Sequence, residues 1–416
     1  MSNINLIYIP LKKVKTTTVG VYIHRELNKN EVSKNAILPH VLKQGCKMCK
    51  NSEEMNKYLE NLYGATLSAG VVNYGDDQIL RLEAQTISDK YAAQGEKLTR
   101  DLVRLIMSVI FEPVTENGAF LKSVVDTEKK NAVDRIKSSI NDKRFYASQR
   151  CIEEMCKGEA FALSKNGTED GVLEITPQNL YEYYRDIITS SVIDIYVVGD
   201  ADEEELRKIV DDASFDIAFK DAEIKKTKLH IKGENVNRVT DHMDVNQGKL
   251  SMGFTTGISP EEEDYFALMV MNSIYGAGAH SKLFNNVREK LSLAYYTSSN
   301  LVKSKGVMIV NAGIEFENFD KAYNEIIEQL EVLKKGEISE LEYTSSINSI
   351  LNSLESYKDD AKALHSFMSG ERVYGTNYTI DYVKDKIKSV KVEDVVRVAQ
   401  QIELDTVYFL AGGEDE

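Results

Sequence analysis

The stretch ITPQNLYEYYRDIITSSVIDIYVVGD, residues 175–200, decides the fold because its pattern returns at the end of the chain. It predicts a short helix, a turn and a buried strand that ends in glycine. Residues 390–413, VKVEDVVRVAQQIELDTVYFLAGG, repeat this order of elements. Such a repeat indicates that the chain of 416 residues is a doubled unit, with one copy of the pattern closing each half.

The segments that precede the two copies also correspond. In the first half, an expected strand TTTVGVYIHRE (16–26) is followed by an apolar helix through NAILPHVLKQG (35–45). In the second half, KLSMGFTTGI (249–258) is followed by YFALMVMNSIYG (265–276). Each half then continues with two strands that flank a turn and with long helices that carry one apolar stripe.

This organisation predicts an α+β fold of two structurally similar domains, each with an antiparallel or mixed sheet covered by helices. We expect the first domain at residues 1–218 and the second at 239–416. The intervening residues 219–238 are charged and poor in apolar side chains, which is typical of a linker. Two facing domains joined by one linker would enclose a cleft or chamber.

Composition excludes several classes of partner. The net charge of −15 argues against a nucleic-acid backbone, which needs a basic surface. The longest apolar runs are too short to span a membrane. At the N-terminus apolar residues precede the lysines, the reverse of a signal peptide, so we expect a cytoplasmic protein.

Four cysteines form two sequence pairs, Cys46/Cys49 and Cys151/Cys156. Together they could make a four-thiolate zinc site, if the fold brought the pairs together. The second spacing is wide for such a site, and reduced thiols without a metal are the expectation for a cytoplasmic chain.

The helix that contains AILPHVLKQGC (36–46) carries the next signal. Together with the duplication, it resembles the pitrilysin/insulinase family of metallopeptidases, the inverzincins, over essentially the whole chain. That family carries H-x-x-E-H on an early helix, where two histidines bind zinc and the glutamate activates water. Alignment on Gly45 puts these three positions at Ala36, Pro39 and His40.

A later helix of the family supplies a further glutamate ligand, and here the matching position is Arg135. Glu128 matches a carboxylate of the pattern that is not a ligand. Alanine and proline cannot bind a metal, and a guanidinium would repel one. We therefore expect no metal and no catalytic residue in this chain alone, and we expect Pro39 in the first turn of its helix.

The second half retains a motif, SKLFNNVREKLSLAYYTSS (281–299), with Arg288 on a helix and Tyr295 seven residues later at the start of a strand. The resemblance implies that this pair binds peptide substrate and donates to the oxyanion. The residues alone also allow a plain structural role, with Arg288 paired to Glu289 and Tyr295 packed at an edge. Tyr296 is the adjacent alternative, expected on the opposite face.

The resemblance implies a non-catalytic subunit of a heterodimeric zinc endopeptidase, which closes the chamber and orients a peptide. Its partner would be a homologous subunit that carries H-x-x-E-H and holds the zinc, while this chain would hold no cofactor. In isolation the chain could form a homodimer. The alternative is a structural or assembly subunit of the same fold without a role in proteolysis.

Overall fold

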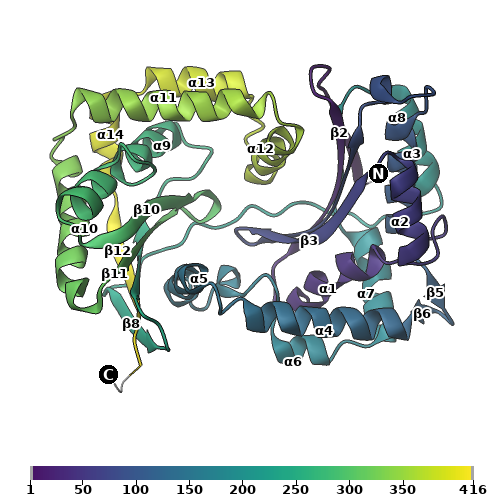
Figure 1. The fold of residues 1–416 in the computed structure, drawn as a ribbon, viewed down its shortest axis with the longest axis horizontal. Coiled ribbons are helices and arrows are strands. Elements are labelled where there is room, and N and C mark those ends of the chain that lie inside the picture. Colours follow the sequence, from purple (N-terminus) through teal and green to yellow (C-terminus); the bar gives the residue numbers. More distant parts are fainter. Residues whose placement is uncertain (1–2, 414–416) are drawn as a thin grey trace. The chain divides into compact units, whose positions relative to one another are not determined.

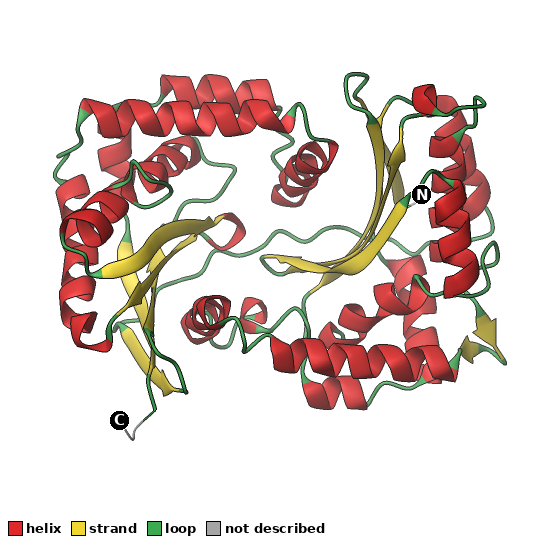
Figure 2. Cartoon of the chain, viewed as in Figure 1, coloured by secondary structure: helices red, strands yellow, loops and turns green. Residues whose placement is uncertain are grey.

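The computed structural model describes residues 3–413, which form two compact units. Unit 1 holds residues up to 137 together with 163–226 and 357–373, and unit 2 holds 138–162, 227–356 and 374 onward. Within the described residues, each unit contains a five-stranded sheet with helices packed on it (Figure 1, Figure 2). The predicted α+β fold of two similar sheet units is confirmed.

The sheet of unit 1 has the strand order β1-β7-β2-β4-β3. Strand β1 runs parallel to β7, and the other neighbours are antiparallel. Side chains along a strand point alternately to the two faces of the sheet. The central strands are buried because both faces are covered there. The bounds are β1 Ile4–Pro10, β2 Thr16–Glu26, β3 Thr66–Tyr74, β4 Asp77–Ile87 and β7 Ile193–Gly199.

The helices of unit 1 surround one large apolar core. A small two-stranded ribbon pairs β5 (Thr115–Glu116) with β6 (Ala119–Phe120). The helices are α1 Val32–Leu42, α2 Ser52–Asn61, α3 Leu98–Phe111, α4 Lys122–Ser138, α6 Glu169–Leu173, α7 Pro177–Ser190, α8 Glu203–Ser214 and α12 Ala361–Tyr374.

The sheet of unit 2 has the order β10-β11-β9-β12-β8. Read from its β8 edge, it repeats the sheet of unit 1, since β8 runs parallel to β12 as β1 does to β7. Strand β9 takes the place of β2, and the hairpin of β10 and β11 that of β3 and β4. The bounds are β8 Asn237–His242, β9 Gly248–Thr255, β10 Ala294–Val302, β11 Val307–Ile314 and β12 Glu403–Ala411.

The helices of unit 2 include a π-helix, η3 (Leu283–Lys290), directly before β10. Both predicted hairpins are present, turning after Tyr74 and through Lys303–Lys305. The α-helices are α5 Lys143–Met155, α9 Asp264–Tyr275, α10 Phe319–Lys334, α11 Glu340–Tyr357, α13 Ile380–Ser389 and α14 Val392–Ala399.

The two compact units differ from the two halves of the chain at two helices. Helix α5 comes from the first half but packs on β9 and β12 of unit 2, and α12 comes from the second half but belongs to unit 1. The predicted boundaries at 218 and 239 therefore differ from the units at these two helices. A division drawn from repeats in the sequence follows chain order and cannot detect such an exchange.

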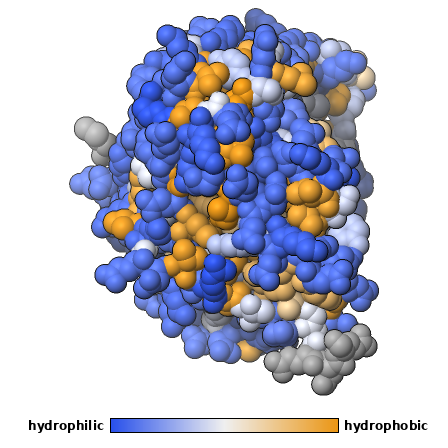
Figure 3. Space-filling view, turned by 90° about the vertical axis from the view of Figure 1, so that its left-hand side faces the viewer, coloured by the Kyte–Doolittle hydropathy of each residue, from blue (hydrophilic) through white to orange (hydrophobic). Residues whose placement is uncertain are grey.

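The surface is predominantly hydrophilic on the face in Figure 3, where hydrophobic residues occur in small scattered groups. This agrees with the charged fraction of 28%. Among the described residues, no helix combines the length and the apolar character that crossing a membrane requires.

Candidate functional site

Helix α1 is the helix on which the zinc motif of the inverzincins would lie. The side-chain oxygen of Asn28 accepts hydrogen bonds from the backbone N–H groups of Asn30 and Glu31, at 3.0 and 3.1 Å, and so starts the helix early. Pro39 therefore lies inside the helix, and its predicted place in the first turn is wrong. Its ring removes one internal hydrogen bond, and the nearly complete burial of α1 holds the helix nonetheless.

The three motif positions follow helical spacing. Ala36, which is 5% exposed, and His40 are four residues apart and so lie on one face of α1. Pro39 is buried, whereas His40 keeps some exposure. Burial, together with the positive charges of Arg135 and Lys43, lowers the pKa of His40 to about 4.

The positive charge of Arg135 contributes to the lowered pKa of His40. Helix α4 therefore brings this fourth motif position toward α1. On the same helix, Glu128 is 4% exposed and accepts a hydrogen bond from Gln44 Nε2 at 2.9 Å. That Arg135 takes the place of a ligand stays a prediction from the alignment of the sequence.

These residues do not fit a catalytic zinc ion. They offer a methyl group, a pyrrolidine ring, one neutral imidazole and a guanidinium, whereas catalytic zinc takes three protein ligands. The guanidinium adds an unfavourable positive charge, and Pro39, at the position of the water-activating glutamate, has no group that could accept a proton. We derive no zinc-dependent step from this position.

The second candidate pair meets in unit 2. Arg288 on η3 and Tyr295 on β10 line one pocket of about 350 Å³. The turn between them includes Ser292 in the left-handed region, with φ of 50°, a conformation that ordinary residues adopt at a cost. The other residues of the pocket are Glu289, Leu293, Ala294, Glu315 and Asn318.

The guanidinium of Arg288 is held by two neighbours on its own helix. It lies 4.7 Å above the ring of Phe284, and its Nε is 3.6 Å from Glu289 Oε1. With 41% of the Arg288 side chain exposed, this ion pair is screened by water and contributes little to stability. The pairing with Glu289 thus exists, but it is loose enough to leave donors for a ligand.

Tyr295 lies at an irregularity of its strand. The pairing of β10 with β11 shifts between Ala294 and Tyr296, so Tyr295 is the extra residue of a β-bulge. Tyr295 is 59% exposed, and its phenol donates a hydrogen bond to Glu315. This hydrogen bond and the charge of Glu315 raise the pKa of Tyr295, which keeps the phenol protonated as a donor.

Tyr296 does not share this pocket. Its ring packs under the guanidinium of Arg144 from α5, at 4.2 Å. The two adjacent tyrosines therefore make different contacts, and Tyr295 is the one beside Arg288.

Sequence reasoning missed Glu315, the hydrogen-bond partner of Tyr295. The signal was available in the hairpin, because partners in an antiparallel pair have residue numbers with a constant sum. Ala294 pairs with Ile314, so the residue after β11 lies close to the start of β10. The bulge, which turns Tyr295 toward Glu315, has no such signal.

The four cysteines are all free and buried. Cys46 and Cys49 pack in the core of unit 1, whereas Cys151 and Cys156 belong to unit 2. Within residues 3–413, Cys156 lies close to two other possible metal ligands, Glu159 and His230. None of the other cysteines belongs to this group. The two cysteine pairs therefore lie in different compact units.

Several known proteins are similar to this chain. A family model described as "Peptidase M16 inactive domain" matches residues 174–350. The "Probable inactive metalloprotease YmfF" of Bacillus subtilis (strain 168) is 34% identical over 98% of this chain and 95% of its own length. The "Uncharacterized zinc protease YmxG" of the same bacterium is 24% identical over 57% of each chain.

A solved structure described as a conserved protein from Enterococcus faecalis V583 has a similar fold. It superposes with a TM-score of 0.91 at 27% identity, over 100% of this chain and 98% of that one. The doubled sheet unit with exchanged helices is therefore a shared architecture and no peculiarity of this sequence.

Proposed function

The chain belongs to the M16 peptidase family, as an inactive homologue, and we propose that it is the non-catalytic subunit of a two-chain zinc endopeptidase. One observation carries the proposal. Arg288 and Tyr295 line one pocket of unit 2. The alignment with the family motif supports it, because Ala36, Pro39 and Arg135 stand at positions that hold metal ligands and the general base in active relatives.

In the proposed complex, the partner is a homologous subunit that carries H-x-x-E-H and binds the zinc. That metal polarises the peptide carbonyl and supplies the activated water. Bacillus subtilis has both a "Probable inactive metalloprotease" and an "Uncharacterized zinc protease" similar to this chain, which supports a division of labour between two chains.

Arg288 and Tyr295 take complementary roles toward the peptide. The guanidinium binds a substrate carbonyl or carboxylate through its fork of donors. The phenol, which donates to Glu315 in the free chain, turns to the oxyanion that forms on the scissile carbonyl. A donor aimed at the developing charge stabilises the transition state more than the bound substrate.

The position of β10 favours an extended peptide as the ligand. This strand forms the edge of its sheet, with β11 as its hydrogen-bonded neighbour. An edge strand offers backbone N–H and C=O groups to a peptide that adds to the sheet. A peptide paired with β10 would pass the pocket of Arg288 and Tyr295, and closing of the chamber over it belongs to the same proposal.

Co-expression tests the proposal. The partner is the M16 chain of the same genome that carries H-x-x-E-H, and the site of action is expected in the cytoplasm. We expect a stable heterodimer that hydrolyses unstructured peptides, with no hydrolysis by either chain alone. A complex with the partner's motif glutamate replaced by glutamine is the matched control and should assemble without activity.

Two results would contradict this function. A heterodimer that forms but hydrolyses no peptide would favour the structural or assembly subunit. Absence of any complex, with this chain remaining a monomer or a homodimer, would remove the two-chain enzyme altogether.

A further inference from the structure

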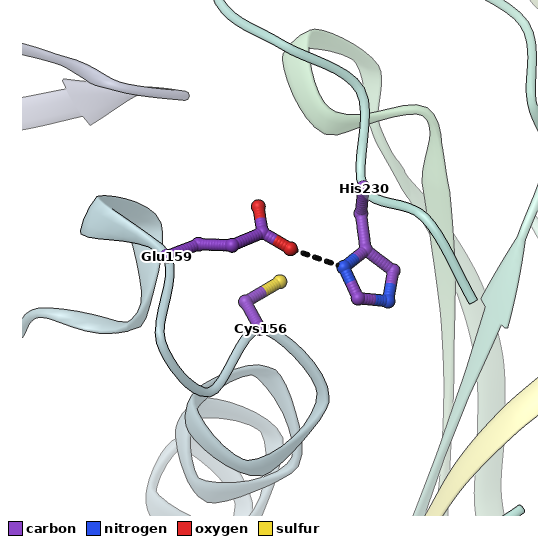
Figure 4. A group of neighbouring side chains, drawn as sticks. All are labelled: Cys156, Glu159 and His230. Carbon is purple, nitrogen blue, oxygen red and sulfur yellow. Dashed lines mark hydrogen bonds and ion pairs between the residues drawn. The ribbon is translucent and has the colours of Figure 1, made fainter. Parts of the chain in front are cut away.

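Three side chains meet in unit 2, away from the pocket of Arg288 and Tyr295 (Figure 4). Cys156 follows the end of α5, Glu159 lies in the next turn, and His230 comes from the segment before β8. Their ligand atoms lie within 4.8 Å of one another. We propose that Cys156, Glu159 and His230 bind a zinc ion, which is independent of any peptidase zinc.

The three atoms are the ligand types that zinc selects. Zinc binds thiolate sulfur, imidazole nitrogen and carboxylate oxygen, and a mixed set of this kind discriminates against calcium and magnesium. Figure 4 shows the thiol and the carboxylate both turned toward Nδ1 of His230.

One adjustment is needed for a metal to enter. Nδ1 of His230 is in direct hydrogen-bond contact with Glu159, and ligands of tetrahedral zinc stand about 3.3 Å apart. Glu159 can make this adjustment, because 31% of its side chain is exposed and it lies in a turn. The same exposure provides the entry path, since Cys156 and His230 are buried.

Asp405 already orients the imidazole of His230. Nε2 of His230 faces Asp405 Oδ2 at 3.3 Å, which leaves Nδ1 for the metal. Asp405 is fixed in turn by the hydroxyl of Thr406, which donates to Oδ1 at 2.6 Å. A carboxylate behind a histidine is the usual outer partner of a metal-bound imidazole.

Lys305 orients the carboxylate in the same manner. Its ammonium lies 2.6 Å from Glu159 Oε2, which leaves Oε1 to face His230. The backbone N–H of His230 also donates to the carbonyl of Lys305 at 2.9 Å, so the turn before β11 holds both ligands in place. The ammonium of Lys305 therefore contacts the carboxylate oxygen of Glu159 that does not face His230.

The charge of the cluster is compatible with a dication. The carboxylates of Glu159 and Asp405 face the imidazole of His230, and the ammonium of Lys305 lies against Glu159. Zinc takes cysteine as the thiolate, so metal binding would release the thiol proton of Cys156.

The ion would join segments that are distant in sequence. It would fix the end of α5 and the segment before β8 to the sheet of unit 2, where Cys156 packs with Met155, Val307 and Ile309. Since a site made of several segments is lost on unfolding, the bound metal stabilises unit 2.

Metal titration of the full chain tests this site. After treatment with a chelator, the chain should bind one equivalent of zinc in competition with a chromophoric chelator. Co²⁺ should give a thiolate-to-cobalt charge-transfer band, and metal binding should release protons to the solution.

Variants separate this site from other binding. Cys156→Ser should abolish the charge-transfer band, and Asp405→Asn should lower zinc affinity roughly 10- to 100-fold, as loss of an outer partner does. Cys151→Ser, which changes a cysteine inside α5 that is as buried as Cys156, is the control that should retain the band. Circular dichroism confirms that each variant is folded.

The proposal is overturned if the folded wild-type chain binds no zinc at about 100 µM. It is equally overturned if Cys156→Ser keeps the wild-type stoichiometry and cobalt spectrum. Because neither readout involves peptide hydrolysis, this result is independent of the two-chain enzyme.

Discussion

His40 lies at the position that the family resemblance gives to the second histidine of the zinc motif. Its imidazole is partly buried on α1, and the guanidinium of Arg135 stands where a carboxylate ligand would otherwise attract a cation. Burial and this charge, together with Lys43, lower the pKa of His40 to about 4. The imidazole of His40 is therefore neutral at physiological pH, and the positive charge of Arg135 would repel a metal ion.

This environment predicts a pH dependence of stability. Between pH 6.5 and about 4, the unfolded chain binds a proton at His40 that the folded chain does not bind. The free energy of unfolding should therefore fall as the pH falls through this window, by on the order of 2 to 3 kcal/mol from His40. His40→Gln should remove that part of the slope, measured by urea unfolding at a series of pH values.

Arg135→Gln is the matched variant for the charge. It should raise the pKa of His40 in an NMR titration, but only in part, because burial is the larger cause. A pKa of His40 near 6.5 in the unaltered chain would contradict this description.

Two glycines in the sheets leave room for the exchanged helices α12 and α5. Gly20 on β2 faces His365 of α12, and an added Cβ would lie 2.2 Å from the imidazole Cε1. Gly253 on β9, the equivalent strand of unit 2, faces Met155 of α5, with 2.6 Å from such a Cβ to the sulfur. Each sheet thus receives a helix from the other half of the chain against a glycine of its β2 or β9 strand.

Gly20→Ala should therefore destabilise unit 1 by about 1 to 3 kcal/mol, the usual cost of overpacking. Removal of the facing ring in the double variant Gly20→Ala/His365→Ala should cost less than the two single changes added together. Gly70→Ala on β3 is the control, because nothing lies within 4 Å of its added Cβ. Thermal or urea unfolding measures all four, and a fully stable Gly20→Ala would show that α12 does not sit on this glycine.

For the whole molecule, the repeat in the sequence was sufficient to predict two similar α+β units. Strand and helix patterns are local, so the copies at 175–200 and 390–413 could be recognised without a structure. The exchange of α5 and α12 could not be predicted from the sequence. The residues of a helix show that it has an apolar face, but they do not show which sheet that face will pack on.

The two candidate sites also differ in whether the sequence could predict them. Arg288 and Tyr295 lie close together in sequence, within one helix-to-strand turn, so their spacing could predict a shared pocket. Cys156, Glu159 and His230 come from segments more than seventy residues apart, and only folding brings them together. The sequence therefore led to an expectation of no metal in this chain, which the proposed zinc site now opposes.

The peptidase activity of the assembled two-chain enzyme tests the central claim most directly. In that enzyme, Arg288→Ala or Tyr295→Phe in this chain should lower kcat/KM by roughly 10- to 1000-fold, as loss of a transition-state donor does. His40→Ala should leave kcat/KM within about twofold, because the partner's metal performs the chemistry. Loss of activity on His40→Ala, with full activity retained by the Arg288 and Tyr295 variants, would contradict a non-catalytic, peptide-binding subunit.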